Sequence, residues 1–264
     1  DDGALVRALR ARRWCASADE ALDDLERLAN EALTVAHAMG DPLLANAARA
    51  WCIADHLARG ERAAANAAIA KFQQIAASLD DPVNKAFARR YDVTLALFDG
   101  RLDDAQRIAR EALDLGIACE DAVARLVFFI QCAVRSFDTR EFAPIEEFAA
   151  RVLLAVPWDL AWRSVLALLF AESGRTAEAA KLLSDFAAAG FPAAGDMNTL
   201  VVWCLFAEAA AVLGDELAAR GLRARIEPFR GRHLIVGAGV ASFGPVDYYA
   251  ARLALVRGDR ANAL

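Results

Sequence analysis

The chain is poor in residues that interrupt regular secondary structure. Its 264 residues include only 15 glycines and 7 prolines, which excludes a collagen-like or other low-complexity fibre. A disordered chain would have few apolar residues and a high net charge, whereas 57% of the residues are apolar and 25% are charged. Alanine and leucine dominate in place of the β-branched and aromatic residues that strands favour. The composition therefore predicts an all-α protein.

Metal-ligand clusters, cysteine pairs and long apolar runs are also missing. The five cysteines contain no C-x-x-C pair, which is typical of free thiols in a cytoplasmic protein. The three histidines form no H-x-x-x-H pattern. The longest run without a charged residue, 233–246, is interrupted by three glycines and a proline, and a bilayer span needs about 20 apolar residues. We expect a cytoplasmic location, no membrane segment, no metal and no cofactor.

The charge balance is acidic. Thirty Lys and Arg against 36 Asp and Glu give a net charge of -6, so the basic surface of a nucleic-acid-binding domain is missing and we expect no direct nucleic-acid binding. Only three of the basic residues are lysines, and 63 residues are alanine. This excess of arginine and alanine is typical of a GC-rich bacterial genome.

Part of the alanine recurs at a fixed position. Turn signals follow long apolar stretches at intervals of 36–44 residues. The turn residues are Gly60, Gly100, a degenerate Asp138, Gly174, Gly214 and Gly258, and five positions after them stand Ala65, Ala105, Ala143, Ala179, Ala219 and Ala263. Glycine allows the left-handed conformation that ends a helix, and a small residue one turn into the next helix lets two backbones approach closely. The pattern predicts helical hairpins that must stack to bury their apolar faces.

Each repeat is interpreted as helix A, a tight turn, helix B and a break often marked by proline. The expected units are 1–41, 42–81, 82–118, 119–156, 157–194, 195–231 and a truncated unit from about 244. Nine positions before the turns stand Trp51, Tyr91, Phe129, Val165, Leu205 and Tyr249, which we expect in the core. The predicted fold is an all-α, right-handed α-α superhelix of about 6.5 helical hairpins in one repeat domain over residues 1–264.

Two resemblances carry functional expectations. The spacing in Gly174-Arg-Thr-Ala-Glu-Ala179 resembles the turn of the tetratricopeptide repeat, although the units here are longer than that family's usual length of about 34 residues. Loose motifs in the order Gly40-Asp-Pro42, Gly190-Phe-Pro192, Pro228-Phe-Arg-Gly-Arg232 and Gly244-Pro-Val-Asp-Tyr-Tyr249 resemble the C-terminal helical repeat region of bacterial STAND-type signalling ATPases. In that family the repeats accompany a LuxR-type helix-turn-helix or an adenylate/guanylate cyclase domain. The resemblance implies that this chain is a fragment of a larger multidomain protein.

No enzyme motif is found in the sequence. The phosphate-binding pattern G-x-x-x-x-G-K-[ST] is missing, so any ATPase or cyclase activity would lie in other domains. The glycine cluster Gly237–Gly244 lacks the spacing of a dinucleotide fingerprint and is followed by Pro245. We expect it to be a partly extended connection packed against the solenoid, with a ligand-contacting loop as the alternative.

The resemblance to tetratricopeptide repeats also implies that helix A lines a concave groove. Offsets from each turn give the candidate groove-binding residues Arg90, Thr94, Arg125, Phe128, Arg135, Ser164, Glu172, Glu208, Tyr248 and Arg252. Among them Arg90, Arg125 and Arg135 favour an acidic peptide, an acidic protein segment or a small anionic effector as the partner. The alternative is that they are solvated or pair with nearby acids such as Asp92 and Glu120.

The expected function is therefore that of a protein- or effector-binding sensor or scaffold domain in a bacterial signalling or transcription regulator. It would act by ligand-biased conformational control. Two alternatives stay open: a structural oligomerisation scaffold without a ligand, and an enzyme that uses the Gly237–Gly244 loop. We expect no catalytic residue.

Overall fold

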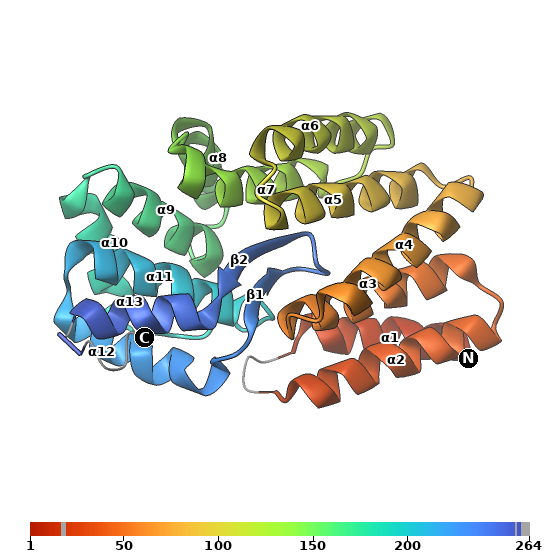
Figure 1. Ribbon diagram of the computed structural model, residues 1–264, viewed down its shortest axis with the longest axis horizontal. Coiled ribbons are helices and arrows are strands. Elements are labelled where there is room, and N and C mark those ends of the chain that lie inside the picture. Colours follow the sequence, from red (N-terminus) through yellow and green to blue (C-terminus); the bar gives the residue numbers. More distant parts are fainter. Residues whose placement is uncertain (17–19, 257, 260–264) are drawn as a thin grey trace. The chain divides into compact units, whose positions relative to one another are not determined.

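The computed structural model describes residues 1–16, 20–256 and 258–259, and most of them lie in α-helices (Figure 1). The helices are α1 (Asp2–Trp14), α2 (Leu22–Ala38), α3 (Pro42–Ala58), α4 (Arg62–Ser78), α5 (Pro82–Phe98), α6 (Leu102–Ala118), α7 (Ala124–Thr139), α8 (Ala143–Ala155), α9 (Leu160–Glu172), α10 (Thr176–Ala188), α11 (Thr199–Leu213), α12 (Glu216–Ile226) and α13 (Val246–Val256). Between α12 and α13 come a short 3-10 helix, η1 (Glu227–Phe229), and a two-stranded hairpin of β1 (His233–Val236) and β2 (Ala241–Pro245). The predicted all-α helical-repeat fold is confirmed.

The helix pairs follow the expected units. Helices α1 to α7 each pack against the next one along the chain, and so do α8 to α13. The odd-numbered helices are the predicted A helices, and the even-numbered ones are the B helices. Among the residues described, no helix has the length and apolar character needed to cross a membrane.

Aspartate and proline together define where A helices begin. Pro42 and Pro82 occupy first-turn positions, where a missing N–H costs nothing. The Asp41 carboxylate accepts hydrogen bonds from the backbone N–H groups of Leu43 and Leu44, both at 3.0 Å. Asp81 caps α5 in the same way. These caps satisfy N–H groups that have no partner within the helix, so the sequence marks these helix starts locally.

The turns inside the hairpins also follow the predicted pattern, with one exception. Gly100 has φ +69°, in the left-handed region that glycine enters without strain. The alanines five residues after the glycine turns are at most 1% exposed: Ala65, Ala105, Ala179 and Ala219. Ala263 lies outside the described residues. Close packing of the two helices therefore explains the recurring alanine.

The exception is the fourth hairpin, whose turn lies two residues later than predicted. Arg140, not Asp138, adopts the left-handed conformation, with φ +63°. Ala143 is consequently exposed, while Ile145, five residues after Arg140, is buried. The prediction was wrong because no glycine marks this turn, and alanine is frequent enough to match a misplaced register.

The same shift changes one predicted core position. Nine residues before their turns, the side chains of Trp51, Tyr91, Val165, Leu205 and Tyr249 are buried as expected. Phe129 is only half-buried. Gln131, nine residues before Arg140, is 2% exposed and takes the corresponding place on α7.

Contacts divide the chain into two compact units. Unit 1 comprises Asp1–Arg140 together with Ile235–Ser242, and unit 2 comprises Glu141–Leu234 together with Phe243–Leu264. The end of the β-hairpin, residues 235–242, consists of the turn 237–240 and two residues of each strand and is called the tip. It belongs to unit 1, although the residues on either side of it belong to unit 2. The single domain expected over 1–264 stays a prediction.

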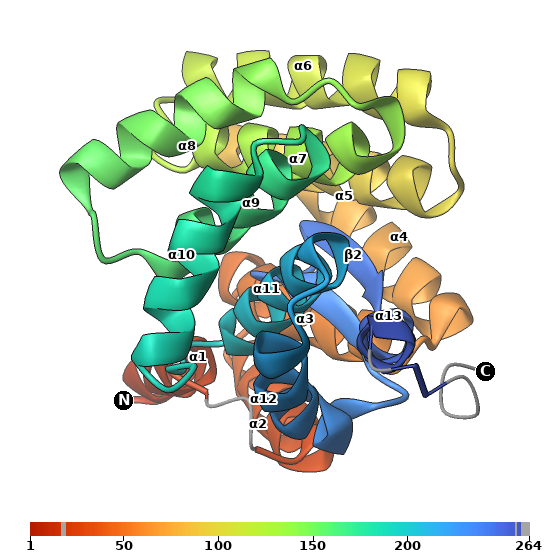
Figure 2. The same ribbon diagram turned by 90° about the vertical axis from the view of Figure 1, so that its left-hand side faces the viewer.

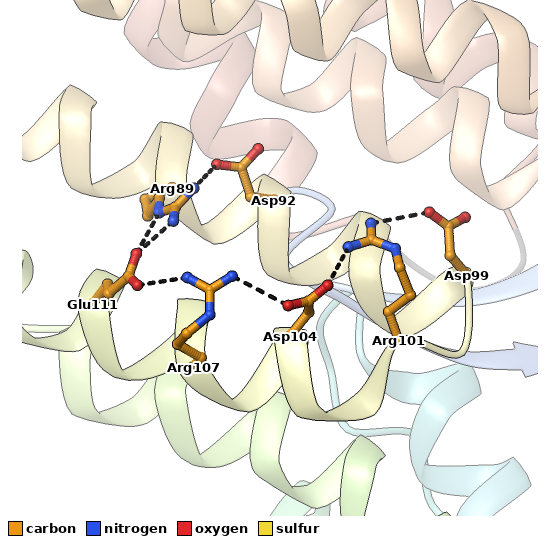
Figure 3. A network of polar contacts seen from close by, with 7 residues as sticks. All are labelled: Arg89, Asp92, Asp99, Arg101, Asp104, Arg107 and Glu111. Atoms are coloured by element: carbon orange, nitrogen blue, oxygen red, sulfur yellow. Dashed lines mark hydrogen bonds and ion pairs between the residues drawn. The ribbon is translucent and has the colours of Figure 1, made fainter.

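An exposed network of ion pairs covers α5 and α6 in unit 1 (Figure 3). It consists of Arg89, Asp92, Asp99, Arg101, Asp104, Arg107 and Glu111. Hydrogen bonds from arginine lower the pKa of Asp104 and of Glu111. These side chains are between 32% and 58% exposed, and exposed ion pairs contribute little to stability. We interpret the network as a solvated outer face.

Candidate functional site: the inner faces of the A helices

In unit 1 the A helices hold the tip through its backbone. The Tyr91 hydroxyl donates a hydrogen bond to the carbonyl oxygen of Ala238 at 2.9 Å. The Thr94 hydroxyl donates to the carbonyl oxygen of Val240 at 2.8 Å, and the Gln131 amide donates to the same oxygen at 2.9 Å. The three donors come from α5 and α7, and Figure 1 shows the tip beside α5 and α3. The face of α5 and α7 that carries these three donors is called the inner groove of unit 1.

The tip fills this groove with small and β-branched side chains. Five of its residues are at most 9% exposed: Ile235, Val236, Ala238, Val240 and Ala241. Gly239 makes the closest approach, since a Cβ atom there would lie 3.2 Å from Ile53 Cγ2 and 3.4 Å from Leu57 Cδ1. Gly239 also has φ +86°, so both the space and the backbone favour glycine. The expected partly extended connection packed against the repeats is confirmed.

Arg90, predicted to face a ligand, is bound within unit 1. It is 2% exposed and forms an ion pair with Asp121, and its guanidinium lies 5.4 Å from the centre of the Phe87 ring. The alternative that this arginine pairs with an acid is therefore confirmed, but the partner is neither of the two acids expected. Asp92 pairs with Arg89 instead.

The other unit 1 candidates were displaced by the register error at the fourth hairpin. Arg125 is exposed, whereas Phe128 and Arg135 are half-buried. The Phe128 ring packs edge-on against Phe129 at 5.3 Å, and Arg135 Nη1 lies 3.5 Å from Thr139 Oγ1. All three were selected by counting back from Asp138. Because the turn residue is Arg140, the same offsets select other residues of α7. Thr94 contacts the tip as a groove residue would, through the carbonyl oxygens of Gly239 and Val240.

In unit 2 the structure brings three predicted residues together. Glu208 lies on α11, and Tyr248 and Arg252 lie on α13, the next A helix (Figure 2). Arg252 Nε donates a hydrogen bond to Glu208 Oε1 at 2.9 Å, and the Tyr248 hydroxyl donates to the same oxygen at 3.2 Å. Glu208 is 6% exposed, whereas Tyr248 is 49% exposed. This group, called the Glu208 cluster, combines a buried acceptor with accessible donors.

Burial dominates the electrostatics of the Glu208 cluster. It raises the pKa of Glu208 even though Arg252 and Tyr248 stabilise the carboxylate. The negative charge of Glu172, on α9, raises that pKa further. Burial and the charge of Glu208 also raise the pKa of Tyr248. Ser164 is fully buried and donates to the carbonyl oxygen of Ala161 at 2.7 Å, so it does not face a ligand.

Sequence reasoning missed two residues that contact the tip. Tyr91 was expected in the core, and its hydroxyl was not assigned a partner. Gln131 was not selected because of the register error, although a glutamine within a mostly apolar stretch was a visible signal, since a buried amide needs hydrogen-bond partners. The described parts of the chain contain no group of three His, Cys, Asp or Glu side chains that could hold a metal ion.

Comparison of the chain with known proteins assigns it to no family. No family model, no curated protein and no solved structure matches this chain. The resemblance to tetratricopeptide repeats and to STAND-type ATPases therefore rests on the short sequence motifs alone.

Proposed function

We propose that this chain is a tetratricopeptide-like, protein- or peptide-binding repeat domain of a bacterial signalling or transcription regulator. One observation carries the proposal. The inner groove of unit 1 holds the turn of the β-hairpin by hydrogen bonds to its backbone carbonyls, and hydrogen bonds to main-chain groups are one way in which a domain binds a peptide whatever its side chains.

Control in such a domain is conformational. A ligand shifts an equilibrium only by the difference in its affinity for the two states. A partner bound across several A helices contacts several repeats at once, so its affinity depends on how the repeats are arranged. Binding would then bias the state of the neighbouring domains in the larger protein, where any enzymatic activity would reside.

The accessible polar groups suggest the chemistry of the partner. Arg125 is exposed on α7, outside the inner groove, and can receive an acidic peptide or a small anionic effector at the surface of unit 1. In unit 2, Tyr248 and Arg252 are partly exposed beside the buried carboxylate of Glu208, so that face offers donors together with an anion. The net charge of -6 disfavours a nucleic-acid partner.

Fluorescence polarisation with labelled acidic, basic and neutral peptides of equal length tests this proposal on the full chain. We expect the acidic peptide to bind saturably and to raise the Tm. Arg125→Glu should weaken binding about tenfold, corresponding to about 1.4 kcal/mol. Arg27→Glu is the matched control, because Arg27 is an exposed helical arginine that pairs only with Asp24 among the contacts found. Equal affinity of both variants, or no binding by any peptide, would contradict the proposal.

An oligomerisation scaffold is the second candidate, and one surface feature favours it. Leu154 and Trp158, near the connection between α8 and α9, are 86% and 74% exposed, and large exposed apolar side chains are typical of protein interfaces. Light scattering over a range of concentrations should then show a mass that increases with concentration. Trp158→Ser should abolish the increase. A constant monomer mass would exclude the scaffold.

A further inference from the structure

Two very exposed apolar side chains lie at the C-terminal end of α8 in unit 2. Leu154 is 86% exposed, and Trp158, three residues after the helix ends, is 74% exposed. Among the other large apolar residues described, Leu217 on α12 is 81% exposed and the rest are at most 51% exposed. Scattered apolar side chains are ordinary on a protein surface, but side chains gathered in one place are typical of an interaction surface.

The exposed residues of α8 form one stripe along the helix. They recur every three or four positions, and so they share one side of it, while Ile145 and Ala149 are buried on the other side. Only two of them carry a charge. The exposed residues are Ala143, Pro144, Glu147, Ala150, Arg151, Leu154 and Ala155.

The outer side of α6 in unit 1 shows what a solvated helix face looks like in this chain. Its exposed residues include Asp103, Arg107, Arg110 and Asp114, and the ion pairs of Figure 3 extend along it. Water stabilises such a face without any partner. The stripe on α8 is mostly apolar, so covering it with another apolar surface is favourable.

The charges of the stripe identify what can cover it. Glu147 and Arg151 lie one helical turn apart, with Oε1 and Nη1 separated by 3.7 Å. In an antiparallel pair of α8 helices centred on position 149, Glu147 of each copy lies opposite Arg151 of the other. A parallel pair would instead place each charge opposite the same charge of the second copy, which is unfavourable. The stripe is therefore complementary to itself in the antiparallel orientation.

The uncharged residues of the stripe fit the same register. Pro144 of one copy lies opposite Leu154 of the other, and Ala143 lies opposite Ala155. Small residues at both ends let the two helices approach closely. A two-fold axis brings the same patch of both copies together and requires this kind of self-complementarity.

We propose that α8 is a self-association surface, through which two copies of this chain pair by antiparallel packing of their α8 helices about a two-fold axis. The proposal rests on the oligomerisation scaffold, the second candidate function, and specifies its helix, its partner and its orientation.

The length of α8 limits the affinity. Its 13 residues span about 20 Å, and a strip one helix wide, about 10 Å, has an area of about 200 Å². Stable complexes bury about 800 Å² on each partner. We therefore expect a weak, reversible dimer whose proportion rises with the concentration of the chain.

Two charge-reversed variants of the full chain test the orientation. Glu147→Arg places a second positive charge opposite Arg151 of the other copy, and Arg151→Glu places a second negative charge opposite Glu147. In sedimentation equilibrium, each variant alone should dimerise at least about tenfold more weakly than the wild type. An equimolar mixture should dimerise about as well as the wild type, because both contacts of the mixed pair then join opposite charges.

The mixture separates contacts between copies from the ion pair within α8, since that internal pair is broken in both variants. Lys181→Glu is the matched control, because Lys181 and Asp185 form an exposed ion pair at the same spacing on α10. It should dimerise like the wild type. Its mixture with Glu147→Arg has the same net charges as the test mixture and should associate less, because one of its two contacts joins like charges.

A third variant tests the apolar part of the stripe. Leu154→Glu places a charge opposite Pro144 of the second copy and should weaken dimerisation at least about tenfold. Leu154 is 86% exposed, and the side chains of Glu147 and Arg151 are 72% and 63% exposed, so all three variants should keep the helical circular dichroism of the wild type.

Three results would overturn the proposal. A mass that rises with concentration equally in the wild type and in both charge-reversed variants would exclude α8 as the interface and leave the scaffold standing. A mixture that dimerises no better than either variant alone would exclude the antiparallel pair. A constant monomer mass of the wild type would exclude both the pair and the scaffold. The acidic-peptide test at Arg125 concerns another helix and is independent of all three.

Discussion

The two units are built from the same helical hairpin, yet their inner faces carry different chemistry. In unit 1, Tyr91, Thr94 and Gln131 are uncharged, fully buried and bound to the backbone of the tip. In unit 2, Glu208 is buried but is contacted by Tyr248 and Arg252, which are partly exposed and belong to the helices of the unit itself.

The difference shows how a repeat separates architecture from recognition. One position of the repeat, six residues before the turn, is occupied by Thr94, Glu208 and Arg252 in three different repeats. The same position therefore carries a hydroxyl, a negative charge and a positive charge. The alanine that brings the paired helices together stays the same in both units. Close packing therefore constrains the helix-to-helix contact, while the inner face is free to vary.

The largest expected effect concerns the buried ion pair of unit 1. Arg90→Met should lower the free energy of unfolding by about 3–5 kcal/mol, because it leaves the Asp121 carboxylate buried without its counter-charge. The neighbouring Arg89→Met should lower it by less than about 1 kcal/mol, because Arg89 is 32% exposed. Urea denaturation measures both. Equal losses would show that burial does not distinguish the two arginines.

The next largest expected effect on stability concerns the hydrogen bonds between the tip and unit 1. Thr94→Val and Gln131→Leu should each cost about 1 kcal/mol, because each leaves the Val240 carbonyl with one remaining donor. The double variant should cost about 3 kcal/mol, more than the sum, because the carbonyl then has no donor. Ser164→Ala in unit 2 is the control, since its hydroxyl bonds only to its own helix. An additive double-mutant cycle in urea denaturation would exclude a shared acceptor.

A smaller effect is the pH dependence that arises in unit 2. The pKa of Glu208 is raised above its ordinary value of 4.5, so the folded chain binds that proton more tightly than the unfolded chain. Stability should therefore fall as the pH rises from about 4.5 through the raised pKa. Glu208→Gln should flatten this part of a Tm–pH curve, and Arg252→Met should steepen it because Arg252 lowers that pKa.

A second carboxyl group, in unit 1, also contributes to this dependence of stability on pH. Burial also raises the pKa of Asp55, and a raised carboxyl pKa contributes the same direction of pH dependence. Glu208→Gln should therefore remove only part of the slope. An unchanged slope would show that Glu208 does not titrate differently in the folded chain.

The smallest effect concerns the exposed ion pairs of both units. Arg107→Gln in the network of Figure 3 should lower the Tm only slightly, and the difference should disappear near 1 M salt, where the Debye length is about 3 Å. Arg175→Gln in unit 2 should keep part of its effect at high salt, because Arg175 also lies 4.1 Å from the centre of the Phe170 ring. A salt-independent effect of Arg107→Gln would contradict a purely electrostatic role.

Local signals explain which parts of the fold could be predicted. The Asp-Pro caps at residues 41–42 and 81–82 and the glycine at 100 specify helix ends through their own backbone chemistry. At the fourth hairpin no such residue exists, and Arg140 adopts the left-handed conformation instead. The register error there left Gln131 out of the predicted core positions and placed Arg125, Phe128 and Arg135 among the groove candidates.

The candidate site was predictable only where it follows the repeat register. Glu208, Tyr248 and Arg252, selected by their offsets from Gly214 and Gly258, lie in contact with one another, and both of these turn residues are glycines. The contact between Tyr91 and Ala238 joins residues 147 positions apart, and no repeat register relates them. Its acceptor is a backbone carbonyl, which every residue has, so the identity of the side chain at position 238 gives no signal for this contact.

The sequence by itself determined the stacked helical hairpins, because helix caps, turn glycines and packing alanines act between neighbours in the chain. Only the tertiary structure decided that residues 235–242 occupy the inner groove of unit 1. The physical reason is that this placement depends on close packing and on backbone hydrogen bonds. Gly239 leaves room for Ile53 and Leu57. The carbonyls on either side of it accept hydrogen bonds from Tyr91, Thr94 and Gln131, which come together only when the helices have stacked.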